Sequence, residues 1–301
     1  MSRSHSIAGA AVALAAALAG AQSAHAAALD LYYERALMGA ADARCGLFTP
    51  QIGAALAAAE AQARGAALRS GAPGSSLRAT AASAAAKAAA TSCVSPDLKL
   101  AAARVRQAFQ DYGRLQRMDF PGELAGWKAD RTLPVRTPVW RLVQTASLGG
   151  QPLSFGLAGR WGAPQALIAV TSVAGGDTPY AARLVMRDLA RSSEPYLNQV
   201  RAGSSAKLPL WARTPPRWAS VVFAAEARSP ADPSLAPPGA GSAMAFRFPA
   251  SAAQAIAALD PREAITVELL YPAPTGDVVR KAYVEVGDFA AGQAFLAAAA
   301  R

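Results

Sequence analysis

Histidine is nearly absent from this sequence of 301 residues, which contains only His5 and His25. Both precede residue 27, and residues 1–26 have the form of a cleaved secretory signal peptide. Cleavage after Ala26 would leave a mature chain without histidine. Ser-His-Asp and Cys-His catalysis, His-ligated zinc and His-ligated haem would then be excluded. We identify no catalytic residue, and we expect no metal site and no cofactor.

The N-terminal segment supports export through three features. Arg3 precedes an apolar run from Ile7 to Ala19, which is too short to span a bilayer comfortably. Ala24-His25-Ala26 matches the A-x-A pattern of a cleavage site, and the absence of a twin arginine favours the Sec route. We therefore expect a periplasmic or secreted protein with no transmembrane helix in the mature chain. The alternative is an uncleaved N-terminal anchor.

Cysteine is as scarce as histidine, and its two copies are Cys45 and Cys93. An even pair in an exported protein predicts a disulfide. The alternative is two free thiols with redox activity, but the sequence has no C-x-x-C motif to support redox chemistry. The spacing therefore favours a structural bridge that links two parts of the N-terminal region.

Residues 27–119 predict a helical domain of four helices. Leu29, Tyr33 and Leu37 recur at helical spacing, and Thr49-Pro50 is typical of a helix start. The fourth helix is expected to open at Ser95-Pro96-Asp97 and to bury Tyr112 near its end. Short loops make consecutive helices antiparallel, so the helices that end near Cys45 and Cys93 point the same way.

The residue pattern changes from helical to strand-like after Phe120-Pro121-Gly122. The sequence of residues 123–301 predicts a β-rich domain. Eight strand-like runs are bounded by Gly, Pro, Asp or Ser. They are 139–145, 153–157, 166–173, 182–187, 218–224, 243–248, 265–271 and 278–286. Two helices are expected in the tail, at 251–259 and 289–300. The fold class is therefore α+β: an N-terminal disulfide-stapled α-helical bundle followed by an antiparallel sheet or sandwich with two C-terminal helices.

The net charge is +10, from 30 Lys and Arg against 20 Asp and Glu. Basic residues are spread over both regions, so there is no basic tail that would bind nucleic acid. One stretch interleaves bases with aromatic rings, and it predicts a site for an anionic ligand. Its residues are Arg201, Lys207, Trp211, Arg213, Arg217 and Trp218. The alternative, which the pattern favours, is a solvated basic loop whose indole rings pack into the sheet.

Two patterns in the sequence point instead to catalysis. Ser204-Ser205-Ala206-Lys207 matches S-x-x-K, but the chain has no K-T-G element to accompany it. Glu226, Glu268 and Glu285 lie in or beside predicted strands and are weak candidates for glycoside hydrolysis. We therefore expect an exported, non-catalytic envelope protein that binds an envelope protein, an anionic lipid headgroup or a glycan. The alternative is a histidine-free, carboxylate-based hydrolase acting on glycans.

Overall fold

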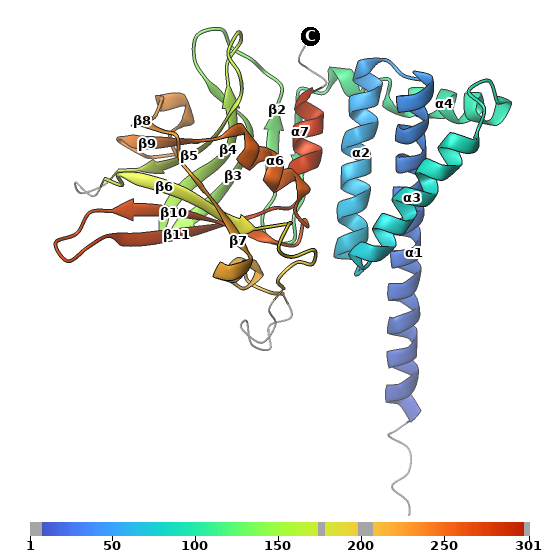
Figure 1. Ribbon diagram of the computed structural model, residues 1–301, viewed down its shortest axis with the longest axis horizontal. Coiled ribbons are helices and arrows are strands. Elements are labelled where there is room, and N and C mark those ends of the chain that lie inside the picture. Colours follow the sequence, from blue (N-terminus) through green and yellow to red (C-terminus); the bar gives the residue numbers. More distant parts are fainter. Residues whose placement is uncertain (1–7, 174–177, 198–206, 298–301) are drawn as a thin grey trace, which may run out of the picture. The chain divides into compact units, whose positions relative to one another are not determined.

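The computed structural model describes residues 8–173, 178–197 and 207–297, and it describes side chains from Ala26 onward. The chain divides into two compact units, residues 1–109 and 110–301. The first unit is helical and the second contains two antiparallel sheets (Figure 1). The α+β class and the order of helical and β-rich regions are therefore confirmed. Arg201 lies outside the described residues.

The first unit consists of four helices, as the periodicity predicts. They are α1 (Ala8–Cys45), α2 (Pro50–Arg69), α3 (Gly74–Ala90) and α4 (Pro96–Phe109). Pro50 occupies the first turn of α2, where its missing N–H costs nothing. Gly71, with φ of 98°, makes the left-handed turn that follows α2. Helix α1 runs continuously through residue 26, the end of the predicted signal peptide.

Helix α4 ends earlier than the sequence suggests. We expected helix up to about residue 118, with Tyr112 on its buried face, and this is wrong. The helix stops at Phe109, Tyr112–Arg114 forms a 3₁₀ turn, and Arg117–Phe120 is strand β1. Strand β1 pairs with β2 in the second unit. This pairing stabilises an extended segment whose local sequence does not predict a strand.

Alanine dominates the core of the helical unit. One cluster joins α1, α2 and α3 around Tyr32, Leu68 and Leu77, and a second joins all four helices around Met38 and Leu56. The other buried members of these clusters are almost all alanine. Alanine side chains let helices approach closely but remove little apolar area from water. A covalent link therefore contributes a large share of the stability of a unit with this composition.

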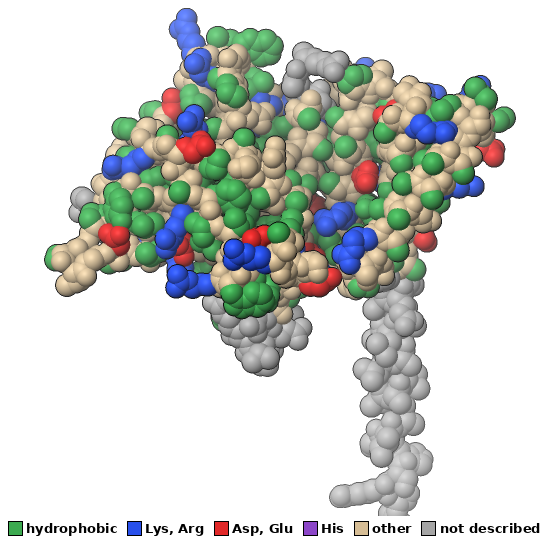
Figure 2. All heavy atoms as spheres, viewed as in Figure 1, with side chains coloured by type: hydrophobic (Ala, Val, Ile, Leu, Met, Phe, Trp, Pro, Cys, Tyr) green, Lys and Arg blue, Asp and Glu red, His purple; other side chains and the backbone are tan. Residues whose placement is uncertain are grey.

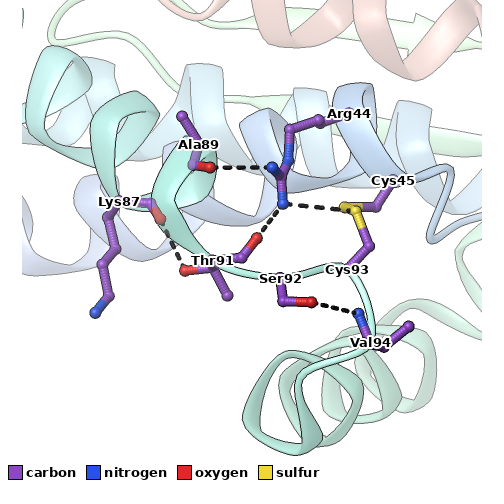
Figure 3. Close-up of a disulfide and its surroundings, with 8 residues drawn as sticks. All are labelled: Arg44, Cys45, Lys87, Ala89, Thr91, Ser92, Cys93 and Val94. Atoms are coloured by element: carbon purple, nitrogen blue, oxygen red, sulfur yellow. Dashed lines mark hydrogen bonds between the residues drawn. A yellow bond between two sulfur atoms is a disulfide. The ribbon is translucent and has the colours of Figure 1, made fainter.

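The predicted disulfide between Cys45 and Cys93 is present (Figure 3). It joins the last residue of α1 to the connection between α3 and α4, with the two Cα atoms 5.6 Å apart. The Arg44 side chain lies beside the bridge. It donates to the carbonyls of Ala89, at 3.0 Å, and Thr91, and its Nη2 lies 3.5 Å from the Cys93 sulfur. The C-terminal ends of α1 and α3 therefore meet at one end of the bundle.

The second unit contains a seven-stranded and a four-stranded sheet. Their strand orders are β1-β2-β3-β4-β5-β9-β8 and β11-β10-β6-β7, and every pair is antiparallel. The strands are β1 (Arg117–Phe120), β2 (Trp127–Asp130), β3 (Val139–Leu148), β4 (Gln151–Gly159), β5 (Ala166–Ser172), β6 (Ala181–Arg187), β7 (Ser220–Ala224), β8 (Ala227–Pro230), β9 (Ala243–Phe248), β10 (Ala264–Tyr271) and β11 (Val278–Glu285). All eight predicted strands are present, and β1, β2 and β8 are additional.

The two sheets are joined where β11 lies beside β3. The Gln144 amide of β3 donates to the Glu285 carbonyl at 3.1 Å and accepts from the Glu285 N–H at 2.8 Å. A side chain thus replaces the strand pairing that β3 and β11 lack. The Trp127 indole N–H adds a bond of 2.9 Å to the Val286 carbonyl.

The two C-terminal helices are α6 (Ala250–Ala258) and α7 (Phe289–Ala297). Helix α6 follows Pro249 rather than the predicted Ser251 cap. Helix α7 packs on β1, β2 and β3 (Figure 1). Phe289 lies edge-on to Trp127 with ring centroids 4.9 Å apart, and Phe295 packs on Phe120 at 5.8 Å. Among the described residues, no helix has the length and apolar character needed to cross a membrane.

Candidate functional site

The predicted basic and aromatic stretch lies in the connection between β6 and β7. Its described part covers residues 188–197 and 207–219 and contains two 3₁₀ turns, Leu210–Arg213 and Arg217–Ala219. Pro209 and Pro216 precede these turns, and each carbonyl accepts a 3.0 Å hydrogen bond from the N–H three residues later. Proline fixes φ and cannot extend a strand ladder, so these residues favour compact turns.

Arg213 anchors this connection to the core. Its side chain is 2% exposed, and Nε donates to the Leu208 carbonyl at 2.7 Å. Nη1 lies 2.8 Å from Glu123 Oε2 and 3.8 Å from Glu285 Oε1. A guanidinium held in this way is not accessible to an external anion. Arg213 therefore belongs to the framework of the predicted site and not to its exposed surface.

The start and the end of the connection are also tied together. Arg191 forms an ion pair of 3.1 Å with Asp188 and donates to the Trp218 carbonyl at 3.2 Å. Arg187, at the end of β6, donates to the Ser192 carbonyl at 2.6 Å. These bonds place the backbone of Trp218 beside the first turn of the connection, although 30 residues separate it from Asp188.

Four of the predicted residues lie at the surface. Trp218 is 65% exposed, Trp211 is 36% exposed, and the Lys207 and Arg217 side chains are also exposed. The Trp218 ring lies edge-on to the Tyr196 ring, with 5.7 Å between centroids. In the space-filling view, hydrophobic and basic side chains lie next to each other over this part of the second unit (Figure 2). We call Lys207, Trp211, Arg217 and Trp218 the aromatic-basic surface.

Trp218 differs from the expectation that the indole rings pack into the sheet. Two more apolar side chains of this region are also exposed: Leu189, at the start of the connection, is 43% exposed, and Val222, on the edge strand β7, is 54% exposed. Burying this apolar area against a partner would be favourable by about 25 cal/mol per Å². The contributions of Arg191 and Tyr196 were not identified from the sequence, since only the folded connection brings them beside Trp218.

The three weak carboxylate candidates are arranged differently from a catalytic pair. Glu285 is fully buried and accepts N–H groups from residues 123–125 at 2.6, 2.8 and 2.7 Å. Glu268 is held between Arg183 and Lys281, with the lysine at 3.2 Å. Glu226 is exposed in the turn between β7 and β8. The carboxylates of Glu285 and Glu268 are thus engaged by hydrogen bonds and ion pairs within the protein.

A buried charge cluster that sequence analysis missed lies under the same connection. Glu263 pairs with Arg187 and accepts the Asp260 N–H at 2.9 Å, while Asp260 pairs with Arg262 at 2.9 Å. Burial raises the pKa of Glu263, and the Arg187 guanidinium opposes this shift. The Arg262 carbonyl in turn accepts from Arg213 at 3.3 Å. Through this hydrogen bond the buried charge cluster helps to position Arg213 and the connection that carries the aromatic-basic surface.

Metal-ligand geometry and similarity to known proteins are two further possible routes to a function. Within the described ranges, no three His, Cys, Asp or Glu side chains gather in a way that could hold a metal ion. Comparisons with protein-family models, with curated proteins and with solved structures found no match to this chain. Function is therefore inferred from the residues of the chain itself.

Proposed function

We propose that the chain is an exported, non-catalytic binding protein of the cell envelope, and that its aromatic-basic surface binds anionic phospholipid headgroups. The observation that carries this proposal is the 65% exposure of Trp218 beside the exposed Arg217. Tryptophan is favoured at membrane interfaces because it has an apolar body and one polar N–H. Each nearby basic residue adds about 1 kcal/mol of attraction to an anionic surface.

The charges and the scaffold agree with this role. Lys207 and Arg217 supply positive charge at the surface, while Arg213 is neutralised by Glu123 and Glu285. Arg213 anchors the connection to the core, so the backbone near Trp218 is already ordered before binding. Binding through Trp218 therefore costs little backbone entropy. The engaged carboxylates Glu268 and Glu285 support a binding role over the histidine-free glycan hydrolase.

Export is a separate part of the proposal. The A-x-A motif at residues 24–26 and the Cys45–Cys93 bridge support an oxidising compartment outside the cytoplasm. We expect the exported protein to begin at Ala27. N-terminal sequencing of the chain recovered from the periplasm or medium tests this, and recovery of the chain only from the cytoplasm would contradict export.

The binding proposal is tested by sedimentation with phospholipid vesicles. We expect binding to vesicles containing phosphatidylglycerol, weaker binding as salt increases, and little binding to phosphatidylcholine alone. Trp218→Ala with Arg217→Ala should weaken binding at least tenfold. Trp161→Ala with Arg114→Ala is the matched control, since these side chains are 60% and 86% exposed elsewhere on the same unit.

Three outcomes would contradict the proposal. They are equal binding to both kinds of vesicle, equal loss in the control variant, and full binding by the Trp218→Ala/Arg217→Ala variant. An acidic polysaccharide such as polygalacturonate serves as a competing ligand. Binding to the polysaccharide without binding to vesicles would overturn the phospholipid assignment in favour of a glycan.

A further inference from the structure

A groove on the outer face of the seven-stranded sheet forms a second region with binding chemistry. It has a volume of about 520 Å³ and lies over β4, β5, β9 and β8. This volume falls in the usual range for small-molecule sites, about 300–1,000 Å³. The aromatic-basic surface contributes none of its lining residues.

The period-two alternation of the strands explains why this face is hollow. Leu167, Phe246 and Phe248 point into the core and are at most 2% exposed. The alternate positions point outward and are mostly small, with Ala245 opposite Val170 and Ser229 opposite Ala245. The small side chains of Ala245, Ser229 and Ala227 leave a depression between their larger neighbours on this face.

One end of this face is already covered by the chain. Residues after β8 fold back over the sheet, and Leu235 packs on Ala158, Ile168 and Val170. The Trp140 indole N–H donates to the Leu235 carbonyl at 3.2 Å. Beyond this covered end, Ile168 and Leu235 continue into the groove and give it an apolar floor. The packing of Leu235 therefore shows that this face of the sheet can bind an apolar side chain.

The groove also has charge of one predominant sign. Arg160, Arg247 and Asp232 line it. Asp232 accepts the Ser234 N–H at 2.9 Å and the Ser234 hydroxyl at 2.7 Å, and these two bonds lower the pKa of its carboxyl group. Arg160 donates to the Val135 carbonyl at 3.3 Å. Within the part of the chain that the structure describes, the exposed Arg247 guanidinium has no hydrogen-bond or ion-pair partner.

Arg247 is placed where it can meet a ligand that lies on the apolar floor. In the strand ladder it is opposite Ile168 on one side and Ala227 on the other, so all three share the outer face. A guanidinium beside an apolar floor complements a molecule that is apolar over most of its length and negatively charged at one end.

We propose that this groove binds a small amphipathic anion, in which a carboxylate is attached to an apolar chain or ring. The apolar part lies on Ile168 and Leu235, and the carboxylate pairs with Arg247. This assignment is independent of the phospholipid surface around Trp218, because the two sites have no residue in common.

The test measures binding of decanoate to the purified protein by calorimetry, below the micelle concentration. Decanol and decyltrimethylammonium, with the same chain but no charge or the opposite charge, are the comparison ligands. We expect decanoate to bind best. Arg247→Ala should weaken decanoate binding about tenfold or more, as expected for loss of a charge-assisted hydrogen bond.

Two further variants separate the groove from general surface charge. Arg228 lies on the neighbouring strand β8 but on the opposite face, since it pairs with the core residue Phe246. Arg228→Ala should therefore bind decanoate as the unmodified protein does. Ser229 is exposed in the groove, so Ser229→Trp should fill it and block decanoate and decanol alike without disturbing the core.

The proposal is overturned if the folded protein does not bind decanoate at millimolar concentration. It is also overturned if decanol or the cation binds as tightly, if Arg247→Ala has no effect, or if Arg228→Ala causes the same loss. Trp218→Ala should leave decanoate binding unchanged, so failure of the phospholipid proposal and failure of this one can be told apart.

Discussion

The Glu263 carboxylate and the Arg187 guanidinium form a two-point ion pair, with N···O distances of 2.7 and 2.6 Å, although their side chains are only 1% and 2% exposed. Arg187 ends β6, and Glu263 immediately precedes β10. The pair thus closes one end of the four-stranded sheet. A buried pair is costly to form, but breaking it by removing one partner is costlier still.

The first prediction follows from this pair. Glu263→Gln leaves the Arg187 charge buried without a carboxylate, and it should lower the free energy of unfolding by about 3–5 kcal/mol. Asp111→Asn is the control, because the Arg114–Asp111 pair is 86% and 67% exposed and should contribute less than about 1 kcal/mol. Urea unfolding followed by tryptophan fluorescence measures both. Equal effects of the two variants would contradict the prediction.

The second prediction concerns the loop that binds Glu285. A Cβ atom at Gly122 would lie 2.1 Å from the Ala125 carbonyl oxygen and 2.8 Å from the Glu285 carboxyl carbon. Gly122→Ala must therefore displace the loop and weaken its three N–H bonds to Glu285, at a cost of about 1–3 kcal/mol or more.

Gly113→Ala provides a matched control for this loop. A Cβ atom there meets nothing within 4 Å, so the variant should be neutral or slightly stabilising. Chemical denaturation of both variants decides the matter. If Gly122→Ala is as stable as Gly113→Ala, the close packing of Gly122 against Glu285 does not restrict this position.

The third prediction concerns the disulfide, whose cysteines are separated by 48 residues. Reduction, or Cys93→Ser, should destabilise the helical unit by about 4 kcal/mol in the chain-entropy description. Circular dichroism with and without dithiothreitol measures this change. All five tryptophans lie after residue 110, so their fluorescence reports on the second unit and should show an unchanged transition. A helical transition insensitive to reduction would be contrary evidence.

The fourth prediction concerns alkaline pH. Burial raises the pKa of Tyr112 to about 12, and the nearby Arg131 charge opposes this shift. The unfolded chain loses this proton near pH 10, whereas the folded chain keeps it until about pH 12. The folded state then binds more protons in this window, so stability falls as pH rises from 10 to 12.

Tyr112→Phe removes this contribution, since phenylalanine does not ionise. The variant should lose less stability than the unmodified protein between pH 9.5 and 11.5. Urea unfolding at several pH values in this range, followed by tryptophan fluorescence, measures the difference. Identical pH dependence in the two proteins would show that Tyr112 ionises alike in the folded and unfolded states.

Much of the fold follows from local patterns. The eight predicted strands are apolar-rich runs of five or more residues, mostly bounded by Gly, Pro, Asp or Ser, and each helix of the first unit has an apolar period or a proline at its start. The missed strands β1, β2 and β8 have four residues each and include charged or proline residues, as in Ala227–Pro230. Such segments become strands because an adjacent strand of the sheet pairs with them. The hydrophobic pattern of four residues is too short to predict this pairing.

The helical unit shows a smaller difference of the same kind. The periodicity predicted an apolar face of the first helix with Leu29, Tyr33, Leu37 and Ala41 on it, and with Tyr32 and Ala36 beside it. In the structure Ala41 is buried as predicted and Tyr32 and Ala36 are buried too, while the three larger residues Leu29, Tyr33 and Leu37 are only half-buried. Small alanine positions can face a neighbouring helix as readily as leucine, because close approach of two backbones excludes water from both.

The sequence by itself determined the two-part organisation, the cysteine pairing and the near absence of histidine, since these depend on composition, spacing and local period. Only the tertiary structure decided the roles of Arg213 and Arg217, two like residues four positions apart. Arg213 is buried because Glu123 and Glu285, from distant parts of the chain, converge on it, whereas Arg217 stays in water. Charge pairing of this kind acts through space, and so no spacing along the chain reveals it.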